Sequence, residues 1–197
     1  GQHKVREMTR LFLVRHGEPE ATWGGAVDDP GLSDAGRDQA AEAADALALL
    51  GPLAIVSSPM RRCRETAAPL EAKVGRNALI EQRVSEVVAP VGVTDRRAWL
   101  RQSFPWDRDV ARRQWRDVDP DLRAWRDSVV GCLLEVKQDT AVFSHFIAIN
   151  ALASVAMRRE DTIVCVPGYA SITEFEVRNG VLELVQFGES MVQGEVR

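Results

Sequence analysis

The sequence predicts a single α/β domain with a mainly parallel central sheet that is covered by helices on both faces. Strand-like and helix-like segments alternate along most of the chain, and the strand-like runs are wholly apolar, as in strands buried on both sides. Near the end, segments 171–177 and 181–187 alternate in polarity around the pair Asn179-Gly180, a strong hairpin signal. We therefore expect one domain over 8–197, with an antiparallel hairpin at the sheet edge.

The first strand and the first helix follow from an apolar run and a capping signal. Residues 11–14 are predicted to form a buried strand. Ser33 is predicted to be a helix N-cap, and Asp34 places a carboxylate in the first turn, where the helix dipole favours it. Alanines and leucines then recur at helical spacing as far as the Gly-Pro pair at 51–52, where the helix is expected to end.

The next strand and helix are predicted in the same way. Residues 53–56 are apolar and form the second expected strand. The following helix is predicted to open with Ser58 as its N-cap and Pro59 at its first position, because proline lacks an N–H that the first turn leaves unbonded anyway. A short third strand is expected near 79–84.

The second half of the chain contains two further helices and one strand. Segment 121–136 has helical spacing, 141–144 is a buried strand, and 146–157 is an apolar helix in which Asn150 is expected to be a buried hydrogen-bonding residue. Between 90 and 120 the alternation lapses, and tryptophans and arginines are interspersed with aspartates. We interpret 90–120 as a small inserted cap that packs its tryptophans inward and pairs its charges, rather than as a surface that stacks nucleic-acid bases.

Composition limits the classes of partner. The net charge of −4 argues against nucleic acid or an anionic membrane surface. No apolar stretch is long enough to span a membrane, and the beginning of the sequence has no signal-peptide pattern. Cys63, Cys132 and Cys165 are too few and too far apart for a disulfide framework or a zinc site, so we expect a cytoplasmic protein without a metal.

Arginines and histidines follow three of the predicted strands, at the point where each strand ends. Arg15 and His16 follow the first, Arg61 and Arg62 lie in the helix after the second, and His145 follows the strand 141–144. Ligands of open α/β sheets bind at these strand ends, where helix N-termini also point, so we expect an oxyanion pocket. Guanidinium groups and histidine suit a phosphoryl group better than a carboxylate, because phosphoryl transfer needs mainly positioning and charge neutralisation.

Histidine can attack phosphorus and hold the phosphoryl group covalently. The imidazole must be neutral for this attack, and Arg15 beside His16 is expected to lower the pKa of that imidazole. The leaving alkoxide needs a proton donor, and Glu86, just past the third expected strand, is the candidate.

The motifs "LVRHGE", "SSPMRRCRETA" and the "SH" that ends a buried strand resemble those of the histidine phosphatase superfamily, also called the phosphoglycerate mutase-like family. They occur in the family's order and span nearly the whole chain. The resemblance implies a three-layer α/β/α sandwich, a phosphohistidine intermediate, and neither metal nor cofactor. It further implies the following roles: His16 as nucleophile, Glu86 as proton donor, and Arg15, Arg62 and His145 as the phosphate clamp.

Three positions depart from the family pattern. Thr22 stands where the family often has an asparagine, and its hydroxyl is expected to donate one hydrogen bond to the phosphate. Phe146-Ile147 replaces a common Gly-Gly pair, so Phe146 is expected to narrow or reposition the pocket wall. The segment after Glu86 lacks the usual glycine and tryptophan, which leaves an ordinary loop carboxylate as the alternative for Glu86.

The predicted function is metal-independent hydrolysis of a small phosphorylated substrate. One alternative is a phosphoglycerate mutase that uses the same intermediate; against it, "ATWGG" lacks the Trp-Asn pair that follows RHG in the mutases compared. Another is a phosphate-binding regulatory protein without activity, which the intact set of two arginines and two histidines argues against. The sequence specifies neither the substrate nor the oligomeric state.

Overall fold

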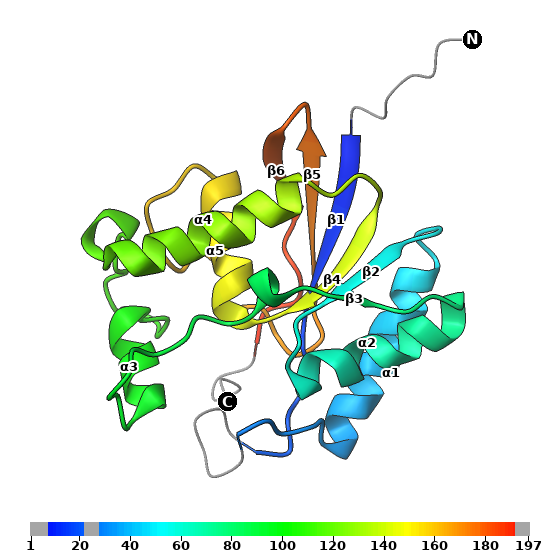
Figure 1. Ribbon diagram of the computed structural model, residues 1–197, viewed down its shortest axis with the longest axis horizontal. Helices are drawn as coiled ribbons and strands as arrows, with labels where there is room; N and C mark the ends of the chain where they lie inside the picture. The colour runs from blue at the N-terminus through cyan, green and yellow to red at the C-terminus, as the bar shows by residue number, and fades with distance from the viewer. Residues whose placement is uncertain (1–7, 22–27, 192–197) are drawn as a thin grey trace.

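The computed structural model describes residues 8–21 and 28–191, and its centre is a six-stranded sheet in the order β3-β2-β4-β1-β5-β6 (Figure 1). The strands are β1 (Met8–Arg15), β2 (Ala54–Ser57), β3 (Leu79–Ile80), β4 (Thr140–Ser144), β5 (Ile172–Arg178) and β6 (Val181–Gln186). The first four are parallel, whereas β5 runs antiparallel to β1 and β6 antiparallel to β5. The mainly parallel sheet with an antiparallel edge hairpin is thus confirmed. Asn179 and Gly180 in the hairpin turn both have positive φ, 52° and 78°, as a type I′ turn requires.

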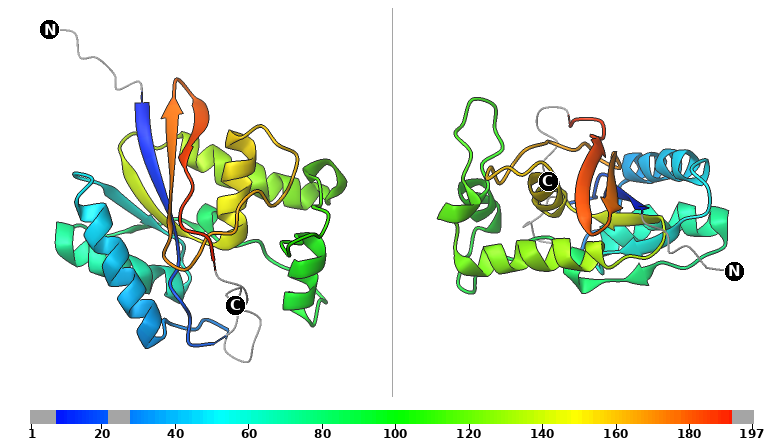
Figure 2. Two further views of the ribbon diagram at one scale, coloured as in Figure 1. Left: turned by 180° about the vertical axis from the view of Figure 1, so that it is seen from behind. Right: turned by 90° about the horizontal axis from the view of Figure 1, so that it is seen from above.

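Helices cover both faces of this sheet, with α1 (Asp34–Ala48) and α2 (Arg61–Val74) on one face and α4 (Pro120–Leu134) and α5 (Phe146–Ala156) on the other (Figure 2). The apolar run in β1 serves both faces because successive side chains of a strand alternate. Phe12 and Val14 pack in the core under α1 and α2, while Leu11 and Leu13 pack in the core under α4 and α5. Among the described residues, no helix combines the length and the apolar composition needed to cross a membrane.

Two local predictions need correction. The N-cap of α2 is Met60 and the helix begins at Arg61, so the prediction of Ser58 as cap and Pro59 as first residue is wrong. The Ser58 side chain is instead hydrogen-bonded to His145, 2.8 Å from Nε2. The third strand is also shorter than predicted, because after β3 the chain turns into a 3-10 helix, η1 (Gln82–Val84).

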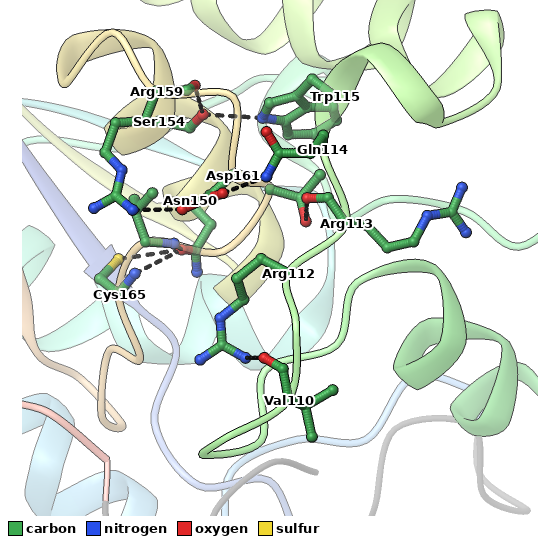
Figure 3. A network of polar contacts seen from close by, with 12 residues as sticks. Val110, Arg112, Arg113, Gln114, Trp115, Asn150, Ser154, Arg159, Asp161 and Cys165 are labelled. Atoms are coloured by element: carbon green, nitrogen blue, oxygen red, sulfur yellow. Dashed lines mark hydrogen bonds and ion pairs between the residues drawn. The ribbon is translucent and has the colours of Figure 1, made fainter.

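Segment 90–120 contains α3 (Arg96–Ser103) and a 3-10 turn, η2 (Trp115–Asp117), and packs against α5. Trp106 and Trp115 are buried in a cluster with Phe146 and Ile147, so these tryptophans do point inward. Figure 3 shows polar contacts that join the end of this segment to α5 and to the chain after it. Trp115 Nε1 donates to Ser154 Oγ at 3.0 Å, and Gln114 is bonded to Asp161.

Asn150 is the buried hydrogen-bonding residue expected at its position. Its Oδ1 accepts from the backbone N–H group of Cys165 (Figure 3) and from that of Val164, and its Nδ2 donates to the Phe146 carbonyl. This side chain therefore fixes the path of the connection that leads from α5 to β5.

Candidate active site

The two histidines of the predicted site lie side by side because β1 and β4 are neighbouring parallel strands. Arg15 is in register with Ser144, so the next residue of each strand, His16 and His145, leaves the sheet at the same edge. The backbone N–H of His16 donates to the Ser144 carbonyl at 3.1 Å. The imidazole centroids are 5.5 Å apart, and both rings are buried. A pair of residues 129 positions apart in sequence is thus brought together by strand register.

Arg15 is held from several sides. Its Nη1 donates to the Pro167 carbonyl at 2.9 Å. The guanidinium carbon lies 4.3 Å from the centre of the Tyr169 ring and 5.4 Å from that of Phe146. Such cation–π contacts stabilise a desolvated cation. Phe146, at the position where the family often has glycine, therefore supports the Arg15 side chain.

Arg62, and not its neighbour Arg61, reaches this site. The Arg62 side chain is buried, and its Nη2 lies 3.2 Å from Nδ1 of His145. Arg61 is exposed and pairs with Glu65 at 2.6 Å. The sequence-based choice of Arg62 agrees with this geometry.

Thr66, one turn after Arg62, fixes α2 to the loop that follows the first histidine. Its hydroxyl donates to the Arg62 carbonyl at 2.7 Å and accepts from the Gly17 N–H at 2.9 Å. Gly17 must be a glycine, because an added Cβ would lie 2.7 Å from the Gly36 carbonyl oxygen at the start of α1. This contact explains the glycine of the RHG motif in physical terms.

His16 has a defined tautomer. Its Nδ1 lies 2.8 Å from the Gly17 carbonyl oxygen, which only accepts, so Nδ1 carries the proton and Nε2 has a free lone pair. The pKa of His16 is lowered well below its usual value, first by burial and then by the positive charges of Arg62 and Arg15; the hydrogen bond to Gly17 opposes this shift. The imidazole is therefore neutral and nucleophilic at neutral pH.

The pKa of His145 is lowered for similar reasons: burial first, then Arg62, His16 and Arg15. Two neutral imidazoles and two guanidiniums consequently share one buried region. Such a region favours an anion, and guanidiniums match the geometry of phosphate oxygens.

Glu86 lies at the N-terminus of α5, beside the second histidine. Its carboxyl oxygens accept from the N–H groups of Ile147 at 3.0 Å and Ala148 at 3.1 Å, and also from the N–H of Val87. The pKa of Glu86 is raised by burial, although these three hydrogen bonds and the charge of Arg62 oppose the shift. The position of this carboxyl suits both a helix-capping group and a proton donor.

Thr22 lies outside the described residues. Tyr169 contacts Arg15 but was not predicted to do so, whereas Ser58 and Thr66, which contact His145 and Gly17, were predicted by helical spacing to lie beside Arg62. Tyr169 follows a Pro-Gly pair in an irregular connection, where no periodicity marks it. Thr66 and Ser58 lie in the quoted motif, four residues from Arg62 on either side, which is the spacing of side chains on one face of a helix.

Fold and site together define an α/β domain with a buried cluster of arginines and histidines at the carboxyl ends of its parallel strands. The model of one family, the histidine phosphatase superfamily (branch 1), matches residues 11–190. The chain belongs to this superfamily, and the resemblance seen in its motifs is confirmed.

Proteins of similar sequence include phosphatases and a probable phosphoglycerate mutase. A glucosyl-3-phosphoglycerate phosphatase of Mycolicibacterium vanbaalenii is 42% identical over 80 residues, which cover 39% of this chain and 36% of the relative. The corresponding protein of Mycobacterium tuberculosis is 32% identical over 111 residues, or 55% of this chain and 48% of the relative. These matches thus span less than half of either relative. A protein of Escherichia fergusonii named "Probable phosphoglycerate mutase GpmB" is 28% identical over 201 residues, covering 93% and 87% of the two chains.

Solved structures share the fold. The native structure of a mycobacterial glucosyl-3-phosphoglycerate phosphatase superposes with a TM-score of 0.70 at 22% identity, covering 92% of this chain and 99% of the other. A phosphoserine phosphatase of Entamoeba histolytica in complex with 3-phosphoglyceric acid gives a TM-score of 0.68 at 21% identity, covering 92% and 98%.

Proposed function

We propose that this protein hydrolyses a phosphomonoester of a small metabolite through a phosphohistidine intermediate. The observation that carries the proposal is the convergence of His16 and His145 with two buried guanidiniums, while Nε2 of His16 is left unprotonated. Phosphoryl transfer without a metal ion requires a neutral nucleophile and cationic side chains that hold the phosphoryl oxygens, and a protein can supply both.

In the first step, Nε2 of His16 attacks phosphorus in line as the bond to the ester oxygen breaks. Arg15 and Arg62 hold non-bridging oxygens and neutralise their charge, and His145, which takes up a proton on Nδ1 as the anion binds, donates to another. The carboxyl of Glu86 transfers its proton to the departing oxygen and becomes a carboxylate. The raised pKa of Glu86 supports this role, because it increases the protonated fraction of the acid.

In the second step, the Glu86 carboxylate removes a proton from water as the water oxygen attacks phosphorus. The bond between phosphorus and Nε2 of His16 breaks, inorganic phosphate forms, and Glu86 is again protonated. The hydrogen bond from Nδ1 to the Gly17 carbonyl favours both steps, since it stabilises the proton on the nitrogen that does not react.

We also infer that segment 90–120 is the cap that contacts the leaving group. Trp106 lies 5.8 Å from Phe146, ring centre to ring centre, and Phe146 directly follows His145. Arg96 in the first turn of α3 lies 3.9 Å from Asp28, so this segment also meets the chain just before α1. Thr22 is proposed to add a hydrogen bond to the phosphate.

The named relatives support a small phosphorylated carboxylic acid as the first substrate class to test. The names of these similar proteins refer to glucosyl-3-phosphoglycerate, phosphoglycerate and phosphoserine, and each of these compounds carries a carboxylate near its phosphate. The three free thiols, Cys63, Cys132 and Cys165, support a reducing compartment such as the cytoplasm.

The test is an assay of free phosphate released from 3-phosphoglycerate, phosphoserine and p-nitrophenyl phosphate, with and without EDTA. We expect turnover that EDTA does not reduce, and a base-stable, acid-labile phosphoryl label on Nε2 of His16. His16→Ala should abolish both turnover and label. Full turnover by His16→Ala would overturn the mechanism, conversion of 3-phosphoglycerate to 2-phosphoglycerate without free phosphate would identify a mutase, and no turnover at all would favour a binding protein.

A further inference from the structure

His145 is hydrogen-bonded at both of its ring nitrogens. Nδ1 lies 3.2 Å from Nη2 of Arg62, and Nε2 lies 2.8 Å from Oγ of Ser58. A guanidinium only donates, so Nδ1 must accept. The proton of the neutral ring is therefore on Nε2, and Ser58 accepts it. This tautomer is opposite to that of His16, whose proton is on Nδ1.

The Ser58 hydroxyl is itself oriented by further contacts. The backbone N–H of Ser58 donates to the Phe143 carbonyl at 3.0 Å and so connects the end of β2 to β4. The Ser58 side chain is completely buried. The Ser58 oxygen also accepts from the Met60 N–H at 3.3 Å, and the sulfur of Cys63 lies 3.4 Å from Nε2 of His145 and 3.5 Å from the Ser144 carbonyl oxygen. Burial raises the pKa of the Cys63 thiol to about 12, so the sulfur keeps its proton and donates it to that carbonyl.

The donors and acceptors now form one directed chain. It begins at Arg62, which can only donate, and ends at the Ser144 carbonyl, which can only accept. Between these ends, Nε2–H of His145 faces the Ser58 oxygen at 2.8 Å and the Cys63 sulfur at 3.4 Å, and the Cys63 thiol donates to the carbonyl. Because both ends are fixed, the proton of the His145 ring is on Nε2.

We propose that Ser58 is a positioning residue that holds His145 in the Nε2–H tautomer, so that the lone pair of Nδ1 faces Arg62 and the phosphoryl site. The effect on catalysis rests on the proposed function, whereas the tautomer does not. A phosphoryl oxygen that displaces Arg62 from Nδ1 is itself an acceptor, so Nδ1 must take up a proton as the anion binds; because Nε2–H is already bonded to Ser58, this proton is taken up at the same nitrogen in every molecule. Without Ser58, the ring would be free to turn or to change tautomer.

The first test needs no variant. The ¹⁵N chemical shifts of the two imidazoles, measured on the whole protein in phosphate-free buffer above pH 7, report which nitrogen carries the proton. We expect Nε2–H for His145 and Nδ1–H for His16. An Nδ1–H tautomer at His145 would overturn the proposal whatever the enzyme activity.

The second test compares Ser58→Ala with Ser57→Ala. Ser57 is equally buried, but its hydroxyl donates to the Ser58 carbonyl at 2.9 Å, so it is a matched control. We expect Ser58→Ala to lower kcat/KM by about 10- to 100-fold and to mix the His145 tautomers. Ser57→Ala should leave kcat/KM and the His145 tautomer unchanged. Ser58→Thr, which retains a hydroxyl, should keep most of the wild-type kcat/KM.

The outcomes separate the two proposals. Equal rates and equal tautomers in Ser58→Ala and Ser57→Ala would overturn the role of Ser58. If no variant and no wild-type preparation turned over a phosphomonoester, the proposed function would fail, while the ¹⁵N shifts of wild type and Ser58→Thr would still decide the positioning role. If Ser58→Ala does not fold, the ¹⁵N spectra of the wild type and of Ser58→Thr still report the His145 tautomer and so test the proposal.

Discussion

The role of Glu86 is the part of the mechanism that a single substitution tests most directly. Replacing Glu86 by glutamine keeps one acceptor oxygen and removes the acid. If the amide oxygen takes the place of Oε1, the bonds from Val87 and Ala148 remain and the bond from Ile147 is lost. A buried N–H left without its acceptor, here that of Ile147, costs about 1 to 3 kcal/mol, so we expect a net loss of stability of about 1 to 2 kcal/mol.

The catalytic effect should be larger and should depend on the leaving group. A general acid contributes about 10²- to 10⁴-fold, or about 3 to 5 kcal/mol of transition-state stabilisation. An alkyl phosphate such as 3-phosphoglycerate needs this proton, whereas p-nitrophenolate leaves readily without it. We expect Glu86→Gln to lower kcat/KM by about 10²-fold or more for 3-phosphoglycerate, and far less for p-nitrophenyl phosphate.

The assay is steady-state kinetics with both substrates, combined with urea unfolding. Glu71→Gln is the matched control, because Oε2 of Glu71 also accepts a backbone N–H, that of Ala78 at 2.8 Å, but far along α2 from Arg62. It should cost stability and leave the ratio of the two kcat/KM values unchanged. If Glu86→Gln lowered both rates by the same factor, Glu86 would be a cap of α5 and the acid would have to be another group.

Three further predictions concern pH, stability and the pocket wall. The proposed mechanism needs neutral His16, whose pKa is lowered, so kcat/KM should be lost on the acid side only as pH falls through a value well below 6.5. It also needs protonated Glu86, whose pKa is raised, so kcat/KM should fall on the basic side as pH rises through a value above 4.5. An acid-side limb of the pH profile centred at or above 6.5 would contradict the assignment of His16. Asn150→Ala leaves two backbone N–H groups without their acceptor and should lower the free energy of unfolding by about 2 to 4 kcal/mol in urea titrations, whereas exposed Asn77→Ala should change it by less than about 0.5 kcal/mol. Phe146→Ala should cost about 3 to 5 kcal/mol of stability and raise KM, because it removes a buried ring from one side of Arg15; an unchanged KM would separate this ring from substrate binding.

Much of the fold is predictable from the sequence because hydrophobic periodicity and turn chemistry act locally. The alternation of Phe12 and Val14 with their neighbours places them on one face of β1, and the left-handed pair Asn179-Gly180 closes the hairpin. The convergence of the arginines and histidines follows from one rule, that parallel strands end at the same edge. These inferences need no knowledge of side-chain contacts.

The start of α2 and the environment of the site needed the structure. Ser58 has the side chain of an N-cap, but its hydroxyl instead bonds a histidine 87 positions away, and such a long-range contact overrides a local preference. Tyr169 lies in an irregular connection, where its contact with Arg15 depends on the path set by the Asn150 side chain. Sequence periodicity does not encode such a path, and the catalytic roles themselves stay predictions.

Buried charge explains why the groups of the site occur as a set. Arg62 is almost wholly buried, and a buried cation is costly unless an anion or strong acceptors compensate for it. Its side chain is bonded to the neutral ring of His145, and Glu86, whose carboxyl experiences the Arg62 charge, is itself shifted toward its neutral form. A phosphoryl dianion would supply the missing compensation. The pKa of His16, the proposed nucleophile, is lowered first by burial and then by the charges of Arg62 and Arg15. Burial of this site therefore favours both the binding of the anion and the neutral form of His16, and a substitution that exposes the site to water would weaken both together.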